Sequence, residues 1–242
     1  MGFGIRLKVW GDYACFTRPE MKLERVSYDV PTPSALEGML KSVYWKPAIR
    51  YVIDRIIVFN PIRFMNVRRN EVNTKLHYSD VRKRMKGTEM DLSIYAAKKR
   101  SQRAAMILRD VCYGVEFHFE LTDLKSEKHD ECEEKHFNII KRRLEKGQCF
   151  RTPCLGCAEF PVRRLTLVED FDTGRIAREV VDMGDNDLGY MLYGLRFEDG
   201  GKPINGDWEH LVFSDRAQAQ YYRPHMIRGQ IDVRKYAEEM LC

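Results

Sequence analysis

The sequence lacks the features that mark membrane and secreted proteins. No run of 18 apolar residues occurs in the chain, so we expect no transmembrane helix. The opening stretch MGFGIRLKVWGDYACF has no continuous apolar core, which predicts a strand rather than a signal peptide, and no Ser or Thr stands at position 6 for myristoylation. The seven cysteines are odd in number and irregularly spaced, so we interpret them as reduced thiols in a cytoplasmic protein.

Signatures of metal and nucleotide chemistry are also scarce. No Asp/Glu constellation resembles a two-metal nuclease site, and no Walker-type phosphate loop or internal repeat occurs. Cys154 and Cys157 form a lone CxxC, and with Cys132 and His136 upstream they offer four candidate zinc ligands. A single CxxC is weak support for zinc, and the alternative is that these thiols are small packing residues. We therefore expect no metal or other cofactor.

What the chain does have is a concentrated positive charge. Its 242 residues are 44% hydrophobic and 32% charged, which is typical of a globular protein of one large or two small domains, and the net charge is +5. Residues 63–103 hold twelve Lys or Arg against four Asp or Glu, a net charge of +8, so the remainder carries −3. Such a segment suits a polyanion such as nucleic acid, although a solvated, mobile loop is the alternative.

The first half of the chain predicts a strand, a helix and a second strand. Residues 5–10 alternate apolar and polar side chains, which indicates a strand. Thr32 and Pro33 are typical of a helix start, and an apolar helical face follows it. That helix should end before Pro47, with Tyr44 on its last turn. The β-branched stretch at 49–59 predicts the next strand.

The second half predicts a strand, a helix and a strand. Residues 111–121 alternate again, and a helix with a capping box of Asp130 and Glu133 should follow. Phe137, Ile140 and Leu144 mark its buried stripe, Gly147 its end, and residues 162–168 look extended.

This order predicts an α+β protein. Strand, helix, strand, strand, helix, strand is the ferredoxin-like (RRM-like) pattern, which we assign to residues 1–165. The basic insertion at about 63–103 falls between its second and third strands, as a protruding hairpin or a mobile arm. Residues 166–242, with frequent glycines and short extended stretches at 190–197 and 226–233, predict a small antiparallel β-rich C-terminal domain.

The residues best suited to chemistry are Lys135 and His136 at the start of the second helix. A helix N-terminus attracts phosphate, a His transfers protons and a Lys supplies charge, so the pair can cleave RNA through its own 2′-hydroxyl without a metal. Helical spacing predicts that both residues lie off the apolar stripe, so we expect them to face solvent or substrate. The alternative is an ordinary exposed pair on a charged helix. Tyr44 and Trp45 suit phosphate and base contacts, or are core aromatics at a helix end.

At these residues the sequence resembles the CRISPR-associated RAMP proteins of the fifth Cas family, subtype d, from type I-C (Dvulg) systems. The matching blocks run in order across residues 3–165, and the match is looser at 73–100 and from residue 170 onward. The blocks are GDYACFTRPE at 11–20, ERVSY at 24–28, PTPSA at 31–35, YWKP at 44–47, PI at 61–62, RRNE at 68–71, LRDV at 108–111, KH at 135–136, and LG through EF at 155–160.

The resemblance implies a metal-independent endoribonuclease. Members of the family cut CRISPR repeat RNA (pre-crRNA) near the 3′ base of the repeat stem-loop. With the RNA's 2′-hydroxyl as nucleophile, we expect this chain to leave a 2′,3′-cyclic phosphate. Members then stay on the 5′ handle of the crRNA and join the backbone and large subunits of the type I-C surveillance complex. The family's catalytic trio falls on Tyr44, Lys135 and His136. As RNA-binding residues we expect Lys46, Arg63, Arg68, Arg69 and Arg109.

Two other functions compete with this one. The first is a non-catalytic crRNA-binding scaffold subunit of the same complex, and the intact catalytic trio favours the enzyme over this alternative. The second is a metal-dependent DNA nuclease, which would need a carboxylate cluster that the sequence lacks.

Overall fold

A computed structural model describes residues 4–21, 23–122, 132–200, 204–205 and 212–236. The strands and helices, in chain order, are β1 (Ile5–Ala14), β2 (Arg25–Val26), α1 (Pro33–Val43), β3 (Ile49–Val58), β4 (Phe64–Val72), α2 (Tyr78–Met85), β5 (Arg100–Leu121), α3 (Glu133–Lys146), β6 (Arg164–Leu167), α4 (Arg178–Val181), β7 (Asp185–Asp187), β8 (Met191–Phe197), β9 (Ala217–Tyr222), β10 (His225–Ile227) and β11 (Gln230–Asp232). None of the described helices is long and apolar enough to cross a membrane.

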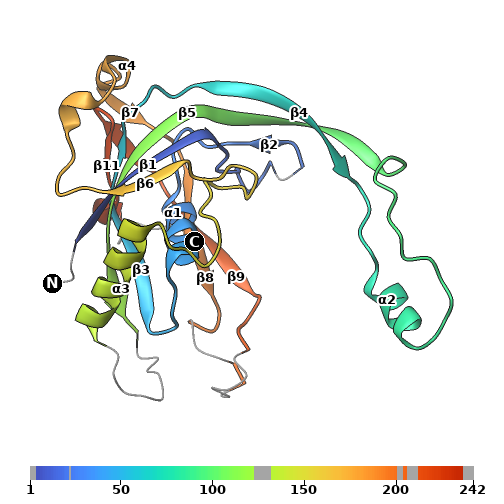
Figure 1. Cartoon of the computed structure of the whole chain (residues 1–242). Helices are drawn as coiled ribbons and strands as arrows, with labels where there is room; N and C mark the ends of the chain where they lie inside the picture. The colour runs from blue at the N-terminus through green and yellow to red at the C-terminus, as the bar shows by residue number, and fades with distance from the viewer. Residues whose placement is uncertain (1–3, 22, 123–131, 201–203, 206–211, 237–242) are drawn as a thin grey trace.

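One large sheet organises the molecule, in the order β6-β1-β5-β3-β11-β10-β7, with neighbouring strands antiparallel (Figure 1). The predicted order of strand, helix, strand, strand, helix, strand is present as β1, α1, β3, β5, α3 and β6. Tyr51 and Phe119 are cross-strand partners whose side chains share one face of the sheet. Tyr51 contacts the end of α1, and Phe119 contacts α3, so both helices cover this face.

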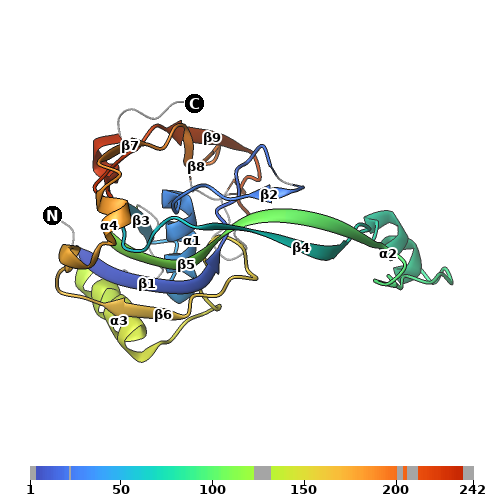
Figure 2. The same ribbon diagram turned by 90° about the horizontal axis from the view of Figure 1, so that it is seen from above.

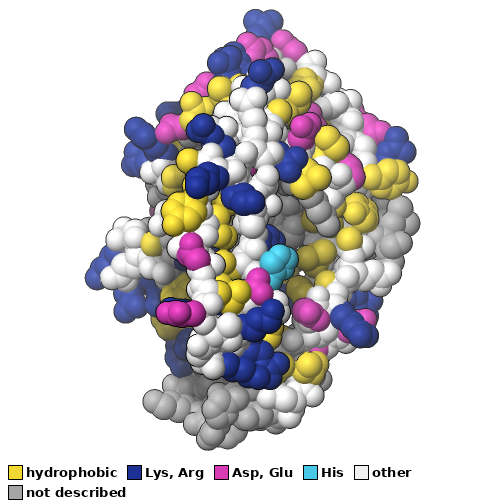
Figure 3. All heavy atoms as spheres, turned by 90° about the vertical axis from the view of Figure 1, so that its right-hand side faces the viewer, with side chains coloured by type: hydrophobic (Ala, Val, Ile, Leu, Met, Phe, Trp, Pro, Cys, Tyr) yellow, Lys and Arg dark blue, Asp and Glu magenta, His cyan; other side chains and the backbone are white. Residues whose placement is uncertain are grey.

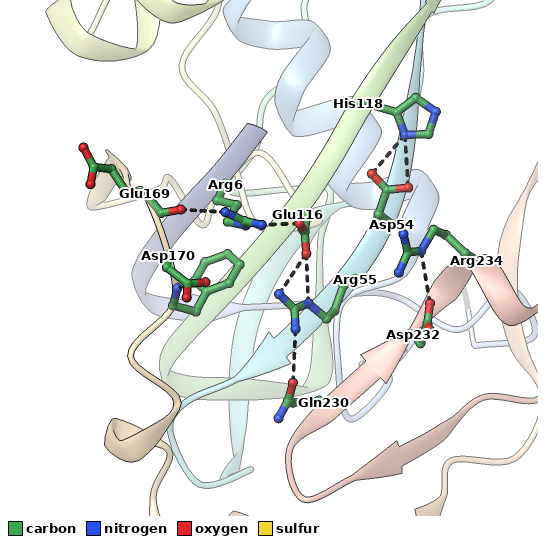
Figure 4. A network of polar contacts seen from close by, with 11 residues as sticks. Arg6, Asp54, Arg55, Glu116, His118, Glu169, Asp170, Gln230, Asp232 and Arg234 are labelled. Carbon is green, nitrogen blue, oxygen red and sulfur yellow. Dashed lines mark hydrogen bonds and ion pairs between the residues drawn. The ribbon is translucent and has the colours of Figure 1, made fainter. Parts of the chain in front are cut away.

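The face of the sheet opposite to these helices carries charged side chains. Glu116 of β5 accepts hydrogen bonds from Arg6 of β1, at 3.1 Å, and from Arg55 of β3, at 2.9 Å. His118 lies 2.9 Å from a carboxylate oxygen of Asp54 (Figure 4). These pairs tie the three central strands together across the face that the helices leave uncovered.

The basic insertion forms a protruding hairpin, which is the first of the two forms predicted for it. The first part of β5 pairs with β4 over Arg100–Leu108, and its second part pairs with β1 and β3. The hairpin leaves the body as a long arm with α2 near its far end (Figures 1 and 2). Where arm and body meet, Asp110 adopts a positive φ of 52°, and Asn60 donates a 2.7 Å hydrogen bond to its carbonyl. No residue of α2 is buried.

The last third of the chain contributes strands to the main sheet. β11 pairs with β3, β10 pairs with both β11 and β7, and β8 and β9 form a separate two-stranded sheet. Met226, Ile231 and Val233 belong to the same hydrophobic core as β1, β3 and β5. The division into domains 1–165 and 166–242 stays a prediction. Residues of both parts contribute to one shared hydrophobic core.

The helix ends mostly follow the predicted signals. Thr32 caps α1 by accepting a 3.2 Å hydrogen bond from the Ala35 amide, and the helix ends at Val43, so Tyr44 stands just after the last turn. Gly147 ends α3 with a left-handed φ of 64°. Asp130 of the expected capping box lies outside the described residues, and Cys132 occupies the N-cap position.

Candidate active site

The C-terminal end of α1 is held in place by side chains from β3 and α3. The Tyr51 hydroxyl donates a 2.8 Å hydrogen bond to the Tyr44 carbonyl. Arg143 donates a 2.7 Å hydrogen bond to the Val43 carbonyl, and its guanidinium lies 5.1 Å from the centre of the Tyr44 ring. The last carbonyls of a helix have no intrahelical partner, so these bonds fix both the helix end and the Tyr44 backbone.

Tyr44 and His136 are in direct contact. The Tyr44 hydroxyl lies 2.9 Å from Nδ1 of His136, and the two ring centres are 5.9 Å apart. The ring of Phe119 meets the His136 ring edge-on at 6.3 Å. Because this hydrogen bond joins the end of α1 to the first turn of α3, residues 92 positions apart in the chain form one site.

Lys135 precedes His136 on the first turn of α3 and is half-buried. The N-terminal turn of a helix carries a partial positive charge, to which the Lys135 ammonium adds. The structure therefore joins the Tyr44 hydroxyl to the His136 imidazole, and Lys135 is the residue before His136 at the helix N-terminus. This combination suits a reaction at a phosphate that needs a proton and positive charge.

The prediction that His136 faces solvent is wrong. Its side chain is 0% exposed, and with Ile140 and Leu144 it makes up the buried residues of α3. Four residues along a helix turn the chain by about 400°, so His136 lies only ~40° from Ile140 on the helix surface. Tyr44 is also buried, at 4% exposure. The Tyr44–His136 hydrogen bond therefore forms away from bulk water, where it is stronger and more directional.

Three residues of the site were not predicted from the sequence: Arg143, Tyr51 and Phe119. Arg143 lies seven residues after His136, which is two helical turns and hence the same side of α3. That spacing was a usable signal. The parts played by Tyr51 and Phe119 depend on the register of β3 against β5, which the sequence pattern does not supply.

Two other histidines pair with carboxylates away from this site. His118 pairs with Asp54, and its Nε2 lies 3.8 Å from Glu120. His225 pairs with Asp185 at 2.8 Å. Both pairs tie neighbouring strands together.

The candidate zinc ligands do not come together. His136 is buried with Nδ1 facing Tyr44, whereas Cys132 is exposed, and the Cys154 thiol faces the Gly156 carbonyl at 3.9 Å. Within the described part of the chain, no group of three or more His, Cys, Asp or Glu side chains is placed to hold a metal ion.

Cys157 instead belongs to a thiol cluster at the base of the arm. Its sulfur accepts a 3.3 Å hydrogen bond from Arg25 and lies 3.6 Å from the Thr17 hydroxyl. A hydrogen bond with the Cys15 thiol, the Thr17 hydroxyl and the Arg25 charge together lower the pKa of Cys157 to about 6, against the effect of burial. The partnership with Cys157 and burial raise the pKa of Cys15.

We expect Cys157 to be the fastest thiol to react with iodoacetamide at pH 7, where most of it is thiolate. It lines an open cavity of about 500 Å³, so the reagent can reach it. Peptide mapping by mass spectrometry should show labelling that rises through pH 6, and Arg25→Ala should move that rise to higher pH. Labelling of Cys157 that begins only above pH 8 would contradict the assignment.

The expected RNA-binding residues divide into two groups. Lys46, Arg68 and Arg109 are exposed, and so is Arg63, which lies 3.5 Å from Glu179. Arg69 points to the other face of β4, where its side chain is 20% exposed and pairs with Glu71 and Glu159. Figure 3 faces the far end of the arm, where Lys and Arg side chains are spread among hydrophobic ones. The placement suits phosphate contacts by Arg68 and a structural role for Arg69.

Arg68→Ala should weaken repeat-RNA binding and flatten its salt dependence by about one slope unit, because one phosphate contact is lost. Arg69→Ala should leave the salt slope unchanged and lower the melting temperature, since it leaves Glu71 and Glu159 without their cation. Filter binding from 50 to 300 mM salt separates the two variants. Equal salt slopes for Arg68→Ala and the unaltered chain would remove Arg68 from the RNA contacts.

Comparison with known proteins shows the family of the chain. The family model for CRISPR-associated protein (Cas_Cas5), subtype Cas5d, matches residues 4–234. The chain is 44% identical over 238 residues to a CRISPR pre-crRNA endoribonuclease Cas5d of Mannheimia succiniciproducens, covering 98% of this chain and 97% of that protein. It is 39% identical over 201 residues to a protein of the same name from Thermus thermophilus, covering 82% and 76% of the two chains.

Solved structures show the same fold at lower identity. A crystal structure of a CRISPR-associated protein superposes with a TM-score of 0.61 at 24% identity, over 96% of this chain and 91% of that one. A functionally uncharacterized protein from Streptococcus mutans gives a TM-score of 0.62 at 22% identity, over 95% and 91%. Because the family model matches residues 4–234, which is nearly the whole chain, the chain belongs to the Cas5d family of CRISPR-associated proteins.

Proposed function

We propose that this chain is a metal-independent endoribonuclease that cleaves CRISPR repeat RNA near the 3′ base of the repeat stem-loop. The observation that carries the proposal is the 2.9 Å contact between Tyr44 and His136, next to Lys135 at the N-terminus of α3. Relatives named as pre-crRNA endoribonucleases, similar over nearly the whole chain, support the substrate class.

The reaction uses the RNA's own nucleophile. The 2′-oxygen attacks the adjacent phosphorus, its proton passes to solvent, and the bond to the 5′-oxygen breaks, which leaves a 2′,3′-cyclic phosphate. Because Nδ1 of His136 is engaged by Tyr44, proton transfer to the leaving 5′-oxygen falls to Nε2. The Lys135 ammonium and the helix N-terminus stabilise the negative phosphorane.

His136 is fully buried, Nε2 included, so RNA can reach this nitrogen only if the groups that cover it move. The Tyr44 hydroxyl holds Nδ1 by a hydrogen bond, and Phe119 contacts the ring edge-on. Arg143 in turn packs on the Tyr44 ring. This enclosure orients the imidazole before substrate binds, which lowers the cost of reaching the reactive geometry.

Tyr44→Phe should slow single-turnover cleavage by about 10- to 100-fold, the range of a lost hydrogen bond to a group that is charged before it gives up its proton. Phe keeps the packing of the helix end, so RNA affinity and melting temperature should stay unchanged. Quench-flow or manual single-turnover assays measure the rate. A change below about 3-fold would demote Tyr44 to a packing residue.

The fold and partners fit the same proposal. The sheet order β6-β1-β5-β3 with α1 and α3 on one face supports a ferredoxin-like N-terminal domain, and β7–β11 support a small C-terminal β-rich unit that shares its core. We infer that the chain stays on the 5′ handle of the crRNA with the backbone and large subunits of a type I-C complex, in the cytoplasm where repeat transcripts are made.

Cleavage in EDTA tests the proposal against the scaffold alternative. Purified protein with cognate repeat RNA and excess EDTA should give a single cut near the stem-loop base, at a rate unchanged by added Mg²⁺. RNA that is bound and stays intact under both conditions would support the scaffold. Cutting that appears only on adding Mg²⁺ would indicate a metal-dependent nuclease.

A further inference from the structure

A second cavity opens at the C-terminal end of α1, just beyond Tyr44 in the chain. It encloses about 540 Å³ between the end of α1, the start of β3, the end of β5 and the segment around β8. Pockets of roughly 300–1,000 Å³ are the usual size for small ligands. Trp45 lines it and is the next residue in the chain after Tyr44, so the cavity lies one residue along the backbone from the candidate catalytic tyrosine.

Three exposed aromatic rings from separate segments converge on this cavity. Trp45 follows α1, Phe197 ends β8, and Phe213 lies before β9, with exposed fractions of 48%, 42% and 39%. Leu121, 41% exposed, adds a fourth apolar side chain. Large apolar side chains gathered around one opening, rather than scattered singly, mark a binding site.

Charges at the rim are balanced and loosely held. Lys41 and Arg50 lie at the cavity with Glu120 and Asp199, so its overall charge is near zero. Lys41 pairs with Glu37 and Arg50 pairs with Glu120, and exposed pairs of this kind are weak enough for a phosphate or ribose oxygen to compete. A flat, uncharged ring attached to a phosphate matches an apolar cavity with cations at its edge.

We propose that this cavity binds one unpaired nucleobase of the RNA, stacked on Trp45, within a nucleotide or two of the scissile phosphate. The proposal rests on the proposed function of the neighbouring site. Bases stack on aromatic side chains with little dependence on sequence, so the cavity selects an unpaired nucleotide at that position rather than a particular base. It thereby places the cut at the edge of the paired stem.

A double-substitution cycle tests this assignment through binding. Repeat RNAs carrying one abasic nucleotide, scanned over three positions on either side of the cut, are titrated against the unaltered chain and Trp45→Ala. One abasic position should cost the unaltered chain about 10-fold or more in affinity, and Trp45→Ala should cost as much on intact RNA. The two changes together should cost no more than either alone, and Trp45→Phe should stay within about 3-fold of the unaltered chain.

Tyr190→Ala is the matched control, because Tyr190 is 56% exposed and does not line the cavity. It should behave like the unaltered chain on every RNA. Two results would overturn the proposal. In the first, abasic losses are equal in the unaltered chain and in Trp45→Ala at all positions. In the second, Trp45→Ala leaves the affinity for intact RNA unchanged, which would point to a protein partner as the occupant of the cavity. Because the cycle reads binding, RNA that shows the coupling yet is never cut would remove the proposed function and keep the base site.

Discussion

His136→Ala should slow single-turnover cleavage of repeat RNA by about 10²–10⁴-fold, the usual contribution of a general acid–base residue. The loss should fall on the chemical step, with RNA affinity retained. A gel-based time course at saturating protein measures the rate, and filter binding measures the affinity under the same conditions.

Because His136 is fully buried, its removal also leaves a cavity against Tyr44 and Phe119. His136→Gln fills more of that space and cannot act as an acid, so it should be as inactive as His136→Ala with a higher melting temperature. His118→Gln is the matched control, since it alters a histidine paired with Asp54 outside the site and should cut normally. Activity that tracks melting temperature across these three variants would contradict a chemical role for His136.

Lys135 supplies charge rather than protons in this account. Lys135→Ala should lose activity by a factor comparable to that of His136→Ala, and added imidazole should not restore it. Lys135→Arg keeps the charge with a different geometry and should retain part of the rate. Cleavage at the unaltered rate by both Lys135→Ala and His136→Ala would end the catalytic assignment.

RNA with a single 2′-deoxy nucleotide just 5′ of the scissile phosphate should bind normally and resist cleavage. The nucleophile is then missing while every contact to the protein remains, so we expect no product within the time that unmodified RNA is cut to completion. A 2′-deoxy nucleotide one position further from the cut is the matched control and should be cleaved. Efficient cutting of the first substrate would show that water attacks, which would revive a metal-dependent scheme.

The sequence predicted the central elements because local chemistry specifies them. Thr32 and Pro33 start α1, Gly147 ends α3, and apolar alternation marks β1 and the second part of β5. The arm was expected from charge and length, because a 41-residue insertion between two strands has few ways to remain compact. The pairing of β5 with β4 over Arg100–Leu108 could be seen only in the structure.

The environment of the site was the part that sequence patterns could not supply. Lys135 and His136 were found as neighbours in the chain, but the burial of His136 depends on the docking of α3 against Tyr44 and Phe119. Similarly, adjacent Arg68 and Arg69 look equivalent in sequence, and only the pleat of β4 separates an exposed side chain from one held by two carboxylates. Long-range register decides both cases, and a single sequence carries little information about register.

The chemical ends of the RNA products test the central claim most directly. Repeat RNA cut by the unaltered chain in EDTA, analysed by mass spectrometry, should give an upstream fragment ending in a 2′,3′-cyclic phosphate and a downstream fragment beginning with a 5′-hydroxyl. An upstream 3′-hydroxyl with a downstream 5′-phosphate would show attack by water and would contradict the account built on Tyr44, Lys135 and His136.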